Sequence, residues 1–299
     1  MATRDLATGM IFLLQTMVGI LGNFSILYHY LFLYFTGCRF RSTDTILKHL
    51  TVANCLVILC KGVPQTMAAL GLKYFLSDTG CKLVFYFHRL GRDVSIGTTC
   101  LLSVFQAITM SPRNSRWAEL KVKAAKYMGT SNILCWVLHM IPNIVVPVYV
   151  TGKLVNKSLT NKRDYDYCYT ADLEEITSSL YVSVLFFHDG FCLGLMLLAS
   201  SSMVSILYRH KRRVRHIHRN NSSSRPSPES TATQNVLVLV STFVSLCTLS
   251  SIFHIFVSLS NNPSVWLVNT SALIAACFPA VSPYILMSHD SRVSKLCFA

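Results

Sequence analysis

Charged side chains are scarce in this sequence of 299 residues. Asp, Glu, Lys and Arg together make up 13% of it, whereas hydrophobic residues make up 52%, and the mean hydropathy is +0.45. So few charges cannot cover the surface of a water-soluble globule of this length. None of the four charged types occurs from Leu6 to Cys38, from Tyr127 to Gly152 or from Ser230 to His289. The composition therefore excludes a soluble protein and predicts one embedded in a lipid bilayer.

The charge-poor runs predict transmembrane helices, because a helix needs about 20 mainly apolar residues to cross about 30 Å of hydrocarbon. The run from Ser230 to His289 is too long for one helix, and Asn261-Asn262-Pro263 is a turn signal near its middle. Six spans are the alternative to seven, because charged residues interrupt the third and fifth stretches. We expect an all-α membrane protein, a single seven-helix domain over residues 1–299, with spans at approximately 9–35, 50–72, 83–110, 127–152, 176–208, 234–260 and 265–288.

Basic residues are distributed unequally between the two sets of loops. With seven spans, one set holds 17 Lys and Arg against four acids, and the other holds seven Lys and Arg against seven acids. The positive-inside rule then favours seven spans, with the N-terminus outside and the C-terminus in the cytosol. The basic residues are spread over four short loops beside the membrane, which argues against a nucleic-acid partner. Within the third cytosolic loop, residues 220–230 are polar and contain proline, so we expect them to be flexible.

Topology also sorts the cysteines and the glycosylation sequons. Of the 11 cysteines, only Cys81 and Cys168 fall on the oxidising side, so we expect them to form a disulfide; two free surface thiols are the alternative. Of five Asn-x-Ser/Thr sequons, only the one at Asn156 lies in a long outer loop. Asn156 is therefore the expected glycosylation site.

Polar side chains inside two of the predicted spans form a candidate ligand site. Ionisable groups in a span are costly and normally face a cavity or one another. In the third span such residues share one side of the helix at the depth of a ligand pocket. The main alternative is structural: an ion pair between Arg89 and Asp93 within the helix, or between Arg92 and Asp189 across helices. The candidate ligand-binding residues are His88, Arg89, Arg92, Asp93, His188 and Asp189.

Several strings in the sequence resemble one receptor family. Gly22-Asn23 in the first span, Cys81 at the start of the third and Ser282-Pro283-Tyr284 in the last resemble landmarks of G-protein-coupled receptors. More specific strings are similar to those of vomeronasal type-1 (pheromone) receptors: Leu-Ser-Val-Phe-Gln-Ala-Ile-Thr at 102–109, Ser-Pro at 111–112, Ser-Arg-Trp at 115–117, His-Lys-Arg-Arg-Val at 210–214 and Phe-Pro-Ala-Val-Ser-Pro at 278–283. The resemblance covers nearly the whole chain.

The resemblance implies a chemosensory receptor in the plasma membrane. Such a receptor binds a small odorant or pheromone from outside and activates a heterotrimeric G protein, of the inhibitory type in this family. A bitter-taste receptor is the nearest alternative, and a transporter or ion channel a remote one. The basic run at the cytosolic end of the fifth span is typical of membrane anchoring, and the resemblance adds contact with the G protein, through Arg209, Lys211, Arg212, Arg213 and Arg215.

The sequence shows no pattern of an enzyme. It offers no nucleophile paired with a base, no glycine-rich phosphate loop and no pair of catalytic carboxylates. His210, His216 and His218 lie among many basic residues, where cation repulsion disfavours a metal. We therefore expect no catalytic activity, no metal and no cofactor.

Overall fold

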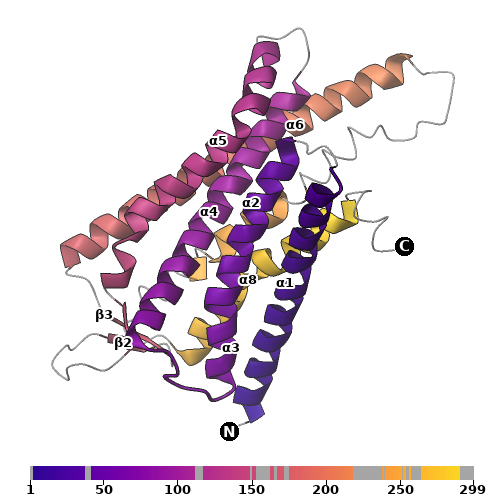
Figure 1. The fold of residues 1–299 in the computed structure, drawn as a ribbon. Helices are drawn as coiled ribbons and strands as arrows, with labels where there is room; N and C mark the ends of the chain where they lie inside the picture. Colours follow the sequence, from indigo (N-terminus) through magenta and orange to yellow (C-terminus); the bar gives the residue numbers. More distant parts are fainter. Residues whose placement is uncertain are drawn as a thin grey trace.

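The structure is a computed structural model that describes residues 3–37, 42–111, 117–148, 150–152, 162–164, 167–171, 175–217, 238, 240–250, 252–253, 256 and 264–289. Its helices run side by side as an elongated bundle (Figure 1). The long helices are α1 (Thr3–Phe35), α2 (Ser42–Val57), α4 (Asp78–Met110), α5 (Trp117–Asn143), α6 (Glu175–Ile217) and α8 (Val265–His289). A shorter apolar helix, Val240–Ser250, lies between α6 and α8 in the chain, and we call it the sixth-span helix.

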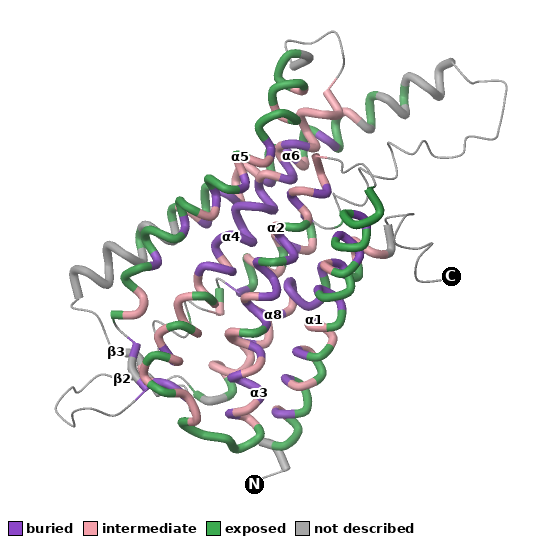
Figure 2. The backbone as a smooth tube through the Cα atoms, in the orientation of Figure 1, coloured by how far each residue is buried: buried purple, intermediate pink, exposed green. Residues whose placement is uncertain are grey.

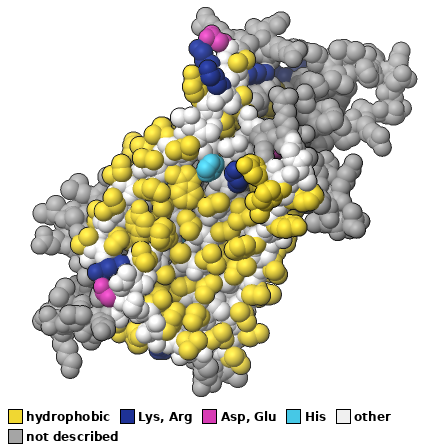
Figure 3. All heavy atoms as spheres, viewed as in Figure 1, with side chains coloured by type: hydrophobic (Ala, Val, Ile, Leu, Met, Phe, Trp, Pro, Cys, Tyr) yellow, Lys and Arg dark blue, Asp and Glu magenta, His cyan; other side chains and the backbone are white. Residues whose placement is uncertain are grey.

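Six helical stretches of the described chain are long and apolar enough to cross a membrane, and the sixth-span helix adds a shorter one. This is the all-α arrangement that the sequence predicts. Their outward surfaces carry large apolar side chains: Leu14, Leu21, Tyr28 and Phe35 along α1 are all exposed. Figure 3 shows hydrophobic side chains over most of one face of the bundle. An apolar surface of this extent suits lipid and not water.

Helix α4 is the central helix of the bundle, because it packs against α2, α5 and α6. Buried positions are concentrated along α4 and α2 (Figure 2). Two glycines of α4 allow this close packing: a Cβ on Gly91 would lie 2.8 Å from the backbone oxygen of Ala53 in α2, and one on Gly97 would lie 2.7 Å from Cys135 Sγ in α5. Small residues let helix backbones approach closely in a membrane, where no hydrophobic effect draws helices together.

The second membrane-crossing stretch is not a uniform α-helix. It passes from α2 into a π-helical turn at Ile58–Gly62 and then into α3 (Val63–Ala69). A π turn closes its hydrogen bonds over five residues and so accommodates one residue more than an α turn. Pro64 follows at the start of α3, where its missing N–H and fixed backbone angle are tolerated.

A small antiparallel sheet covers one end of the bundle. Strands β1 (Val150–Thr151), β2 (Lys162–Asp164) and β3 (Tyr169–Ala171) pair in the order β1-β3-β2. α1 begins at this same end (Figure 1). A disulfide joins Cys168, just before β3, to Cys81 in the first turn of α4, with the two Cα atoms 5.8 Å apart. The backbone N–H of Gly152 also donates to Asp78 Oδ1 at 3.1 Å, so two links fix the loop to α4.

Some boundaries differ from those expected from the sequence. The fourth helix is expected at 127–152, but α5 begins at Trp117 and ends at Asn143, after which the chain enters a 3-10 turn at Val146–Val148 and then β1. Pro147 has no N–H to continue a helix, which explains the earlier end. α6 extends beyond its expected end at residue 208 because its basic residues continue the helix past the apolar part. The expected flexible segment 220–230 lies outside the described residues.

Candidate functional site

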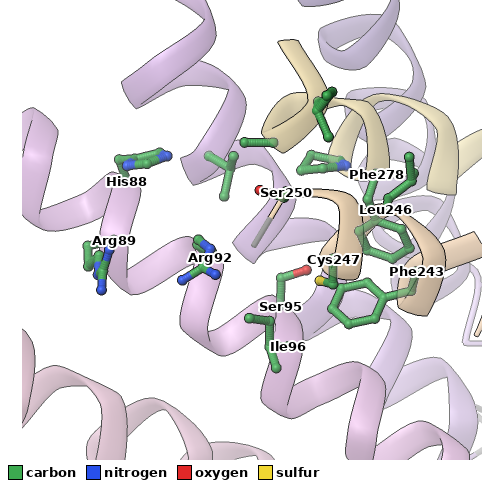
Figure 4. A pocket seen from close by; sticks show the side chains of 14 residues that line it. His88, Arg89, Arg92, Ser95, Ile96, Phe243, Leu246, Cys247, Ser250 and Phe278 are labelled. Carbon is green, nitrogen blue, oxygen red and sulfur yellow. The ribbon is translucent and has the colours of Figure 1, made fainter. Parts of the chain in front are cut away.

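A cavity lies between α4, the sixth-span helix and α8 (Figure 4). Its volume is about 70 Å³. The sixth-span helix contributes Phe243, Leu246, Cys247 and Ser250, and α8 contributes Phe278 with adjacent small or apolar residues. The rings of Phe243 and Phe278 meet edge to face with their centroids 4.4 Å apart. This side of the cavity is therefore mainly apolar, as ligand pockets usually are.

The wall formed by α4 is basic. His88, Arg89 and Arg92 all line the cavity. His88 and Arg89 are adjacent in α4, and Arg92 follows one turn later. No Asp or Glu is among the described residues that line it. Of the six residues expected from the sequence to bind ligand, the structure thus brings these three to the cavity.

The other three expected residues lie behind this wall and hold Arg92 in place. Arg92 Nη2 donates to Asp189 Oδ2 of α6 at 2.8 Å, and its Nη1 lies 3.6 Å from Asp93 Oδ1. The side chains of Arg92 and Asp189 are 20% and 13% exposed, so this is a mostly buried pair. The interhelical bridge predicted between Arg92 and Asp189 is confirmed. Asp93 forms an ion pair with Arg92, its neighbour in α4, whereas the intrahelical alternative paired it with Arg89.

A chain of hydrogen bonds continues from Asp189 into α5. His188 Nδ1 lies 3.3 Å from Asp189 Oδ1, His188 Nε2 lies 3.0 Å from His139 Nε2, and His139 Nδ1 contacts the carbonyl oxygen of Cys135. Asp189 Oδ1 and the carbonyl oxygen of Cys135 accept hydrogen bonds, so the Nδ1 atom of each ring faces an acceptor. His188 Nε2 also lies 3.5 Å from Cys192 Sγ. Two imidazole rings therefore connect Asp189 of α6 with α5.

Asp93 also accepts a hydrogen bond from α5. Asn143 Nδ2 donates to Asp93 Oδ2 at 2.9 Å and to its own helix at His139 O at 2.8 Å. Arg92 lies between two carboxylates, Asp93 of its own helix and Asp189 of α6. These buried ion pairs and hydrogen bonds join α4, α5 and α6.

His139 and Asn143 are not among the site residues expected from the sequence. Both lie in the stretch from Tyr127 to Gly152, which contains no Asp, Glu, Lys or Arg and therefore has the pattern of an apolar span. Their spacing of four residues places them on one face of a helix, and polar residues on one face of a span usually point into the bundle. A count of neutral polar residues would have found them. Ser250 and Cys247, which line the cavity, carried no comparable signal.

The α4 wall of the cavity connects to a second polar network. Ser95, which lines the cavity, donates to Asn54 Oδ1 of α2 at 3.0 Å. Asn54 Nδ2 in turn donates to Ser282 Oγ of α8 at 2.9 Å, next to Pro283. All three side chains are buried. A continuous set of hydrogen bonds therefore links the cavity with α2 and α8.

The outer loop contacts the bundle through Tyr167, which is fully buried beside the disulfide. Lys61 Nζ of the π turn lies 3.4 Å from the Tyr167 hydroxyl and 5.9 Å from the centre of its ring. Burial raises the pKa of the Tyr167 hydroxyl well above its usual value. The hydroxyl therefore stays protonated at all physiological pH values.

The expected contacts with a G protein lie at the other end of the bundle. Arg209, Lys211, Arg212, Arg213 and Arg215 all belong to the last turns of α6, and the side chains of Arg209 and Arg212 are exposed. Asn156, the expected glycosylation site, lies outside the described residues. No group of three or more His, Cys, Asp or Glu in the described part of the chain is arranged to hold a metal ion.

Comparison with known proteins gives one consistent result. The model of the vomeronasal organ pheromone receptor family matches residues 6–299. The chain is 59% identical to human vomeronasal type-1 receptor 4 over 299 residues, which are 100% of the chain and 99% of that receptor. It is 57% identical to human vomeronasal type-1 receptor 2 over 285 residues, 95% of the chain and 72% of that receptor. It is also 29% identical over 290 residues to the zebrafish (Danio rerio) olfactory receptor class A-like protein 1, covering 95% of the chain and 90% of that protein.

These matches confirm the resemblance noted in the sequence and give no support to the bitter-taste alternative. They concern signalling receptors with several transmembrane helices and not enzymes, in agreement with the bundle described above. The chain belongs to the vomeronasal organ pheromone receptor family, and it is a multi-pass membrane receptor of the G-protein-coupled kind.

Proposed function

We propose that the cavity between α4, the sixth-span helix and α8 is the site at which this receptor binds its small-molecule ligand. The observation that carries the proposal is the contrast between its two sides: His88, Arg89 and Arg92 on one, and apolar side chains on the other. A cavity of this kind suits a small molecule with an apolar body and an anionic or acceptor-rich group that faces α4. Asp93, His188 and Asp189 act from behind by orienting Arg92.

Ligand binding must move the helices that enclose the cavity. A cavity of about 150 Å³ takes up benzene, and the volume here is about 70 Å³. A ligand larger than benzene therefore needs the sixth-span helix or α8 to shift outward. A ligand that binds the expanded arrangement more tightly shifts the population toward it.

The shift reaches the cytosolic end through contacts already described. Ser95, Asn54 and Ser282 join the cavity to α8 by hydrogen bonds, and Asp189 joins it to α6. The far end of α6 carries Arg209 and its basic neighbours, which we propose as contacts for the G protein. Resemblance to the family favours a G protein of the inhibitory type.

The test is a ligand screen on the receptor expressed at the surface of cultured cells, measured by dissociation of labelled G-protein subunits. We expect at least one small apolar agonist with a polar group, and an inhibitory G protein as the subunit that dissociates. Phe243→Ala and Phe278→Ala should change the half-maximal concentration of that agonist at equal surface level. An agonist whose potency responds to neither variant would place the ligand outside this cavity.

A further inference from the structure

We propose that Ser250 of the sixth-span helix donates a hydrogen bond to a neutral oxygen of the ligand, so that the receptor selects apolar molecules bearing a hydroxyl or carbonyl group. This inference rests on the proposed function, because it takes the cavity to be the ligand site.

Ser250 is the unusual residue of the apolar side of the cavity. It lines the cavity, its side chain is buried, and the residue is 6% exposed. Its Oγ has no hydrogen-bond partner among the described residues. A buried hydroxyl without a partner costs about 1–3 kcal/mol, so such groups are rare in folded proteins and need an explanation.

Several other hydroxyls of the bundle avoid this penalty by bonding to their own helix, whereas the buried Thr98 Oγ1 of α4, like Ser250 Oγ, has no partner among the described residues. Thr248 in the same helix donates to Val244 O at 2.8 Å, and in α6 Ser201 and Ser202 donate to Leu197 O and Leu198 O at 2.8 and 2.9 Å. This bond to the carbonyl four residues earlier is the usual arrangement for Ser and Thr in helices. The hydroxyl of Ser250 does not make it.

The surroundings of Ser250 define the chemistry of its partner. The residues of its own helix that share the cavity are Phe243, Leu246 and Cys247, and the α8 side presents Phe278, so no carboxylate is near it among the lining residues (Figure 4). The ligand surface on this side must be apolar, with one oxygen at the height of Ser250. A hydroxyl or carbonyl oxygen satisfies the serine without bringing a charge onto an apolar wall. An anionic group fits the α4 wall instead.

The expected selectivity follows from this arrangement. A site built to hydrogen-bond a ligand oxygen discriminates strongly against the analogue that lacks it, because the protein group is then left unpaired. We expect the oxygenated member of a matched pair to bind roughly 10-fold or more tightly than its hydrocarbon. We expect Ser250→Ala to abolish most of that difference.

The experiment uses the purified full-length receptor in lipid nanodiscs. For each probe it measures the concentration that gives half of the maximal increase in melting temperature. The probes are three pairs with matched carbon skeletons: menthone with p-menthane, 2-decanone with decane, and androstan-17-one with androstane. Thr248→Val is the matched control, because its hydroxyl is bonded within the same helix and its side chain is exposed. Wild type and the control should prefer at least one oxygenated probe, and Ser250→Ala should not.

Three results would overturn the inference. The wild-type receptor could prefer no oxygenated probe over its hydrocarbon, or Ser250→Ala could keep the wild-type preference. The third is a melting temperature of the probe-free Ser250→Ala receptor several degrees below that of wild type, since this would show that the hydroxyl has a partner. Measuring G-protein dissociation in parallel separates the two proposals. If the preference for oxygenated probes depends on Ser250 but no probe causes signalling, the proposed function alone is contradicted. If the probes cause signalling but Ser250→Ala keeps the wild-type preference, this inference alone is contradicted.

Discussion

Replacing Arg92 with alanine should destabilise the receptor before any effect on ligand binding can be measured. The substitution leaves Asp189 without its 2.8 Å partner and Asp93 without its 3.6 Å partner, in positions that are 13% and 3% exposed. Removing one member of a buried ion pair costs about 3–5 kcal/mol, because it leaves an uncompensated buried charge. This is a large fraction of the stability of a typical protein domain, about 5–15 kcal/mol.

The assay is the surface level of an epitope-tagged receptor by flow cytometry, with the melting temperature of the purified protein as a second measurement. Arg92→Ala should give a small fraction of the wild-type surface level. The double variant Arg92→Gln with Asp189→Asn should recover part of it, because the carboxylate of Asp189 is removed together with the guanidinium that paired with it. A full exchange of the two charges is a poorer test, since an aspartate at 92 would lie beside Asp93. A wild-type surface level for Arg92→Ala would refute the reasoning.

The recovered double variant also separates the two roles assigned to Arg92. The guanidinium of Arg92 has two proposed partners, Asp189 and the ligand. If it contacts both, the double variant should reach the cell surface but need a higher concentration of an anionic or acceptor-rich agonist than wild type does. An unchanged dose response would show that Arg92 serves structure alone.

Three further predictions concern the outer loop and the helix packing. Cys168→Ser should remove the link to Cys81 and lower stability by about 2–5 kcal/mol, seen as reduced surface level; mass spectrometry of non-reduced digests that found both thiols free in the mature wild-type receptor would contradict this. Asn156→Gln should abolish the shift in gel mobility that glycosidase treatment causes, whereas Asn221→Gln should leave it unchanged, and a glycan at Asn221 would reverse the proposed orientation. Gly91→Val should destabilise by about 1–3 kcal/mol through overpacking, because its Cβ would lie 2.8 Å from a backbone oxygen of α2; a melting temperature equal to that of wild type would show that the two helices can separate without penalty.

The helices could be predicted from the sequence because lipid imposes a simple requirement. A span must be apolar for about 20 residues and must satisfy its own backbone hydrogen bonds. Boundaries were less predictable, since a helix does not end where the hydrocarbon ends: α6 continues through its basic residues to Ile217. α5 ends at Asn143 although the sequence stays apolar beyond it, because Pro147 has no N–H with which to continue the helix.

The candidate site was only partly predictable. Helical spacing places His88, Arg89, Arg92 and Asp93 on one side of α4, but that side is broad enough to face both the cavity and the neighbouring helices. Whether a given residue faces the cavity or a neighbouring helix depends on how α4 is rotated against α5 and α6. This rotation is decided by packing at positions such as Gly97. The apolar residues of the cavity and Ser250 have a role only because of the residues packed around them, so no sequence pattern predicts that role.

The π turn at Ile58–Gly62 has a consequence for how this receptor tolerates insertions and deletions. Removing one residue from an ordinary α-helix rotates everything beyond it by about 100°, which would turn the apolar face of a span away from its neighbours. The π turn already holds one residue in excess. Deleting Leu59 would therefore let the stretch form a continuous α-helix in which α2 and α3 present the same faces to their neighbours as before. A single-residue deletion should be compatible with folding here, whereas the same deletion six residues earlier should not be.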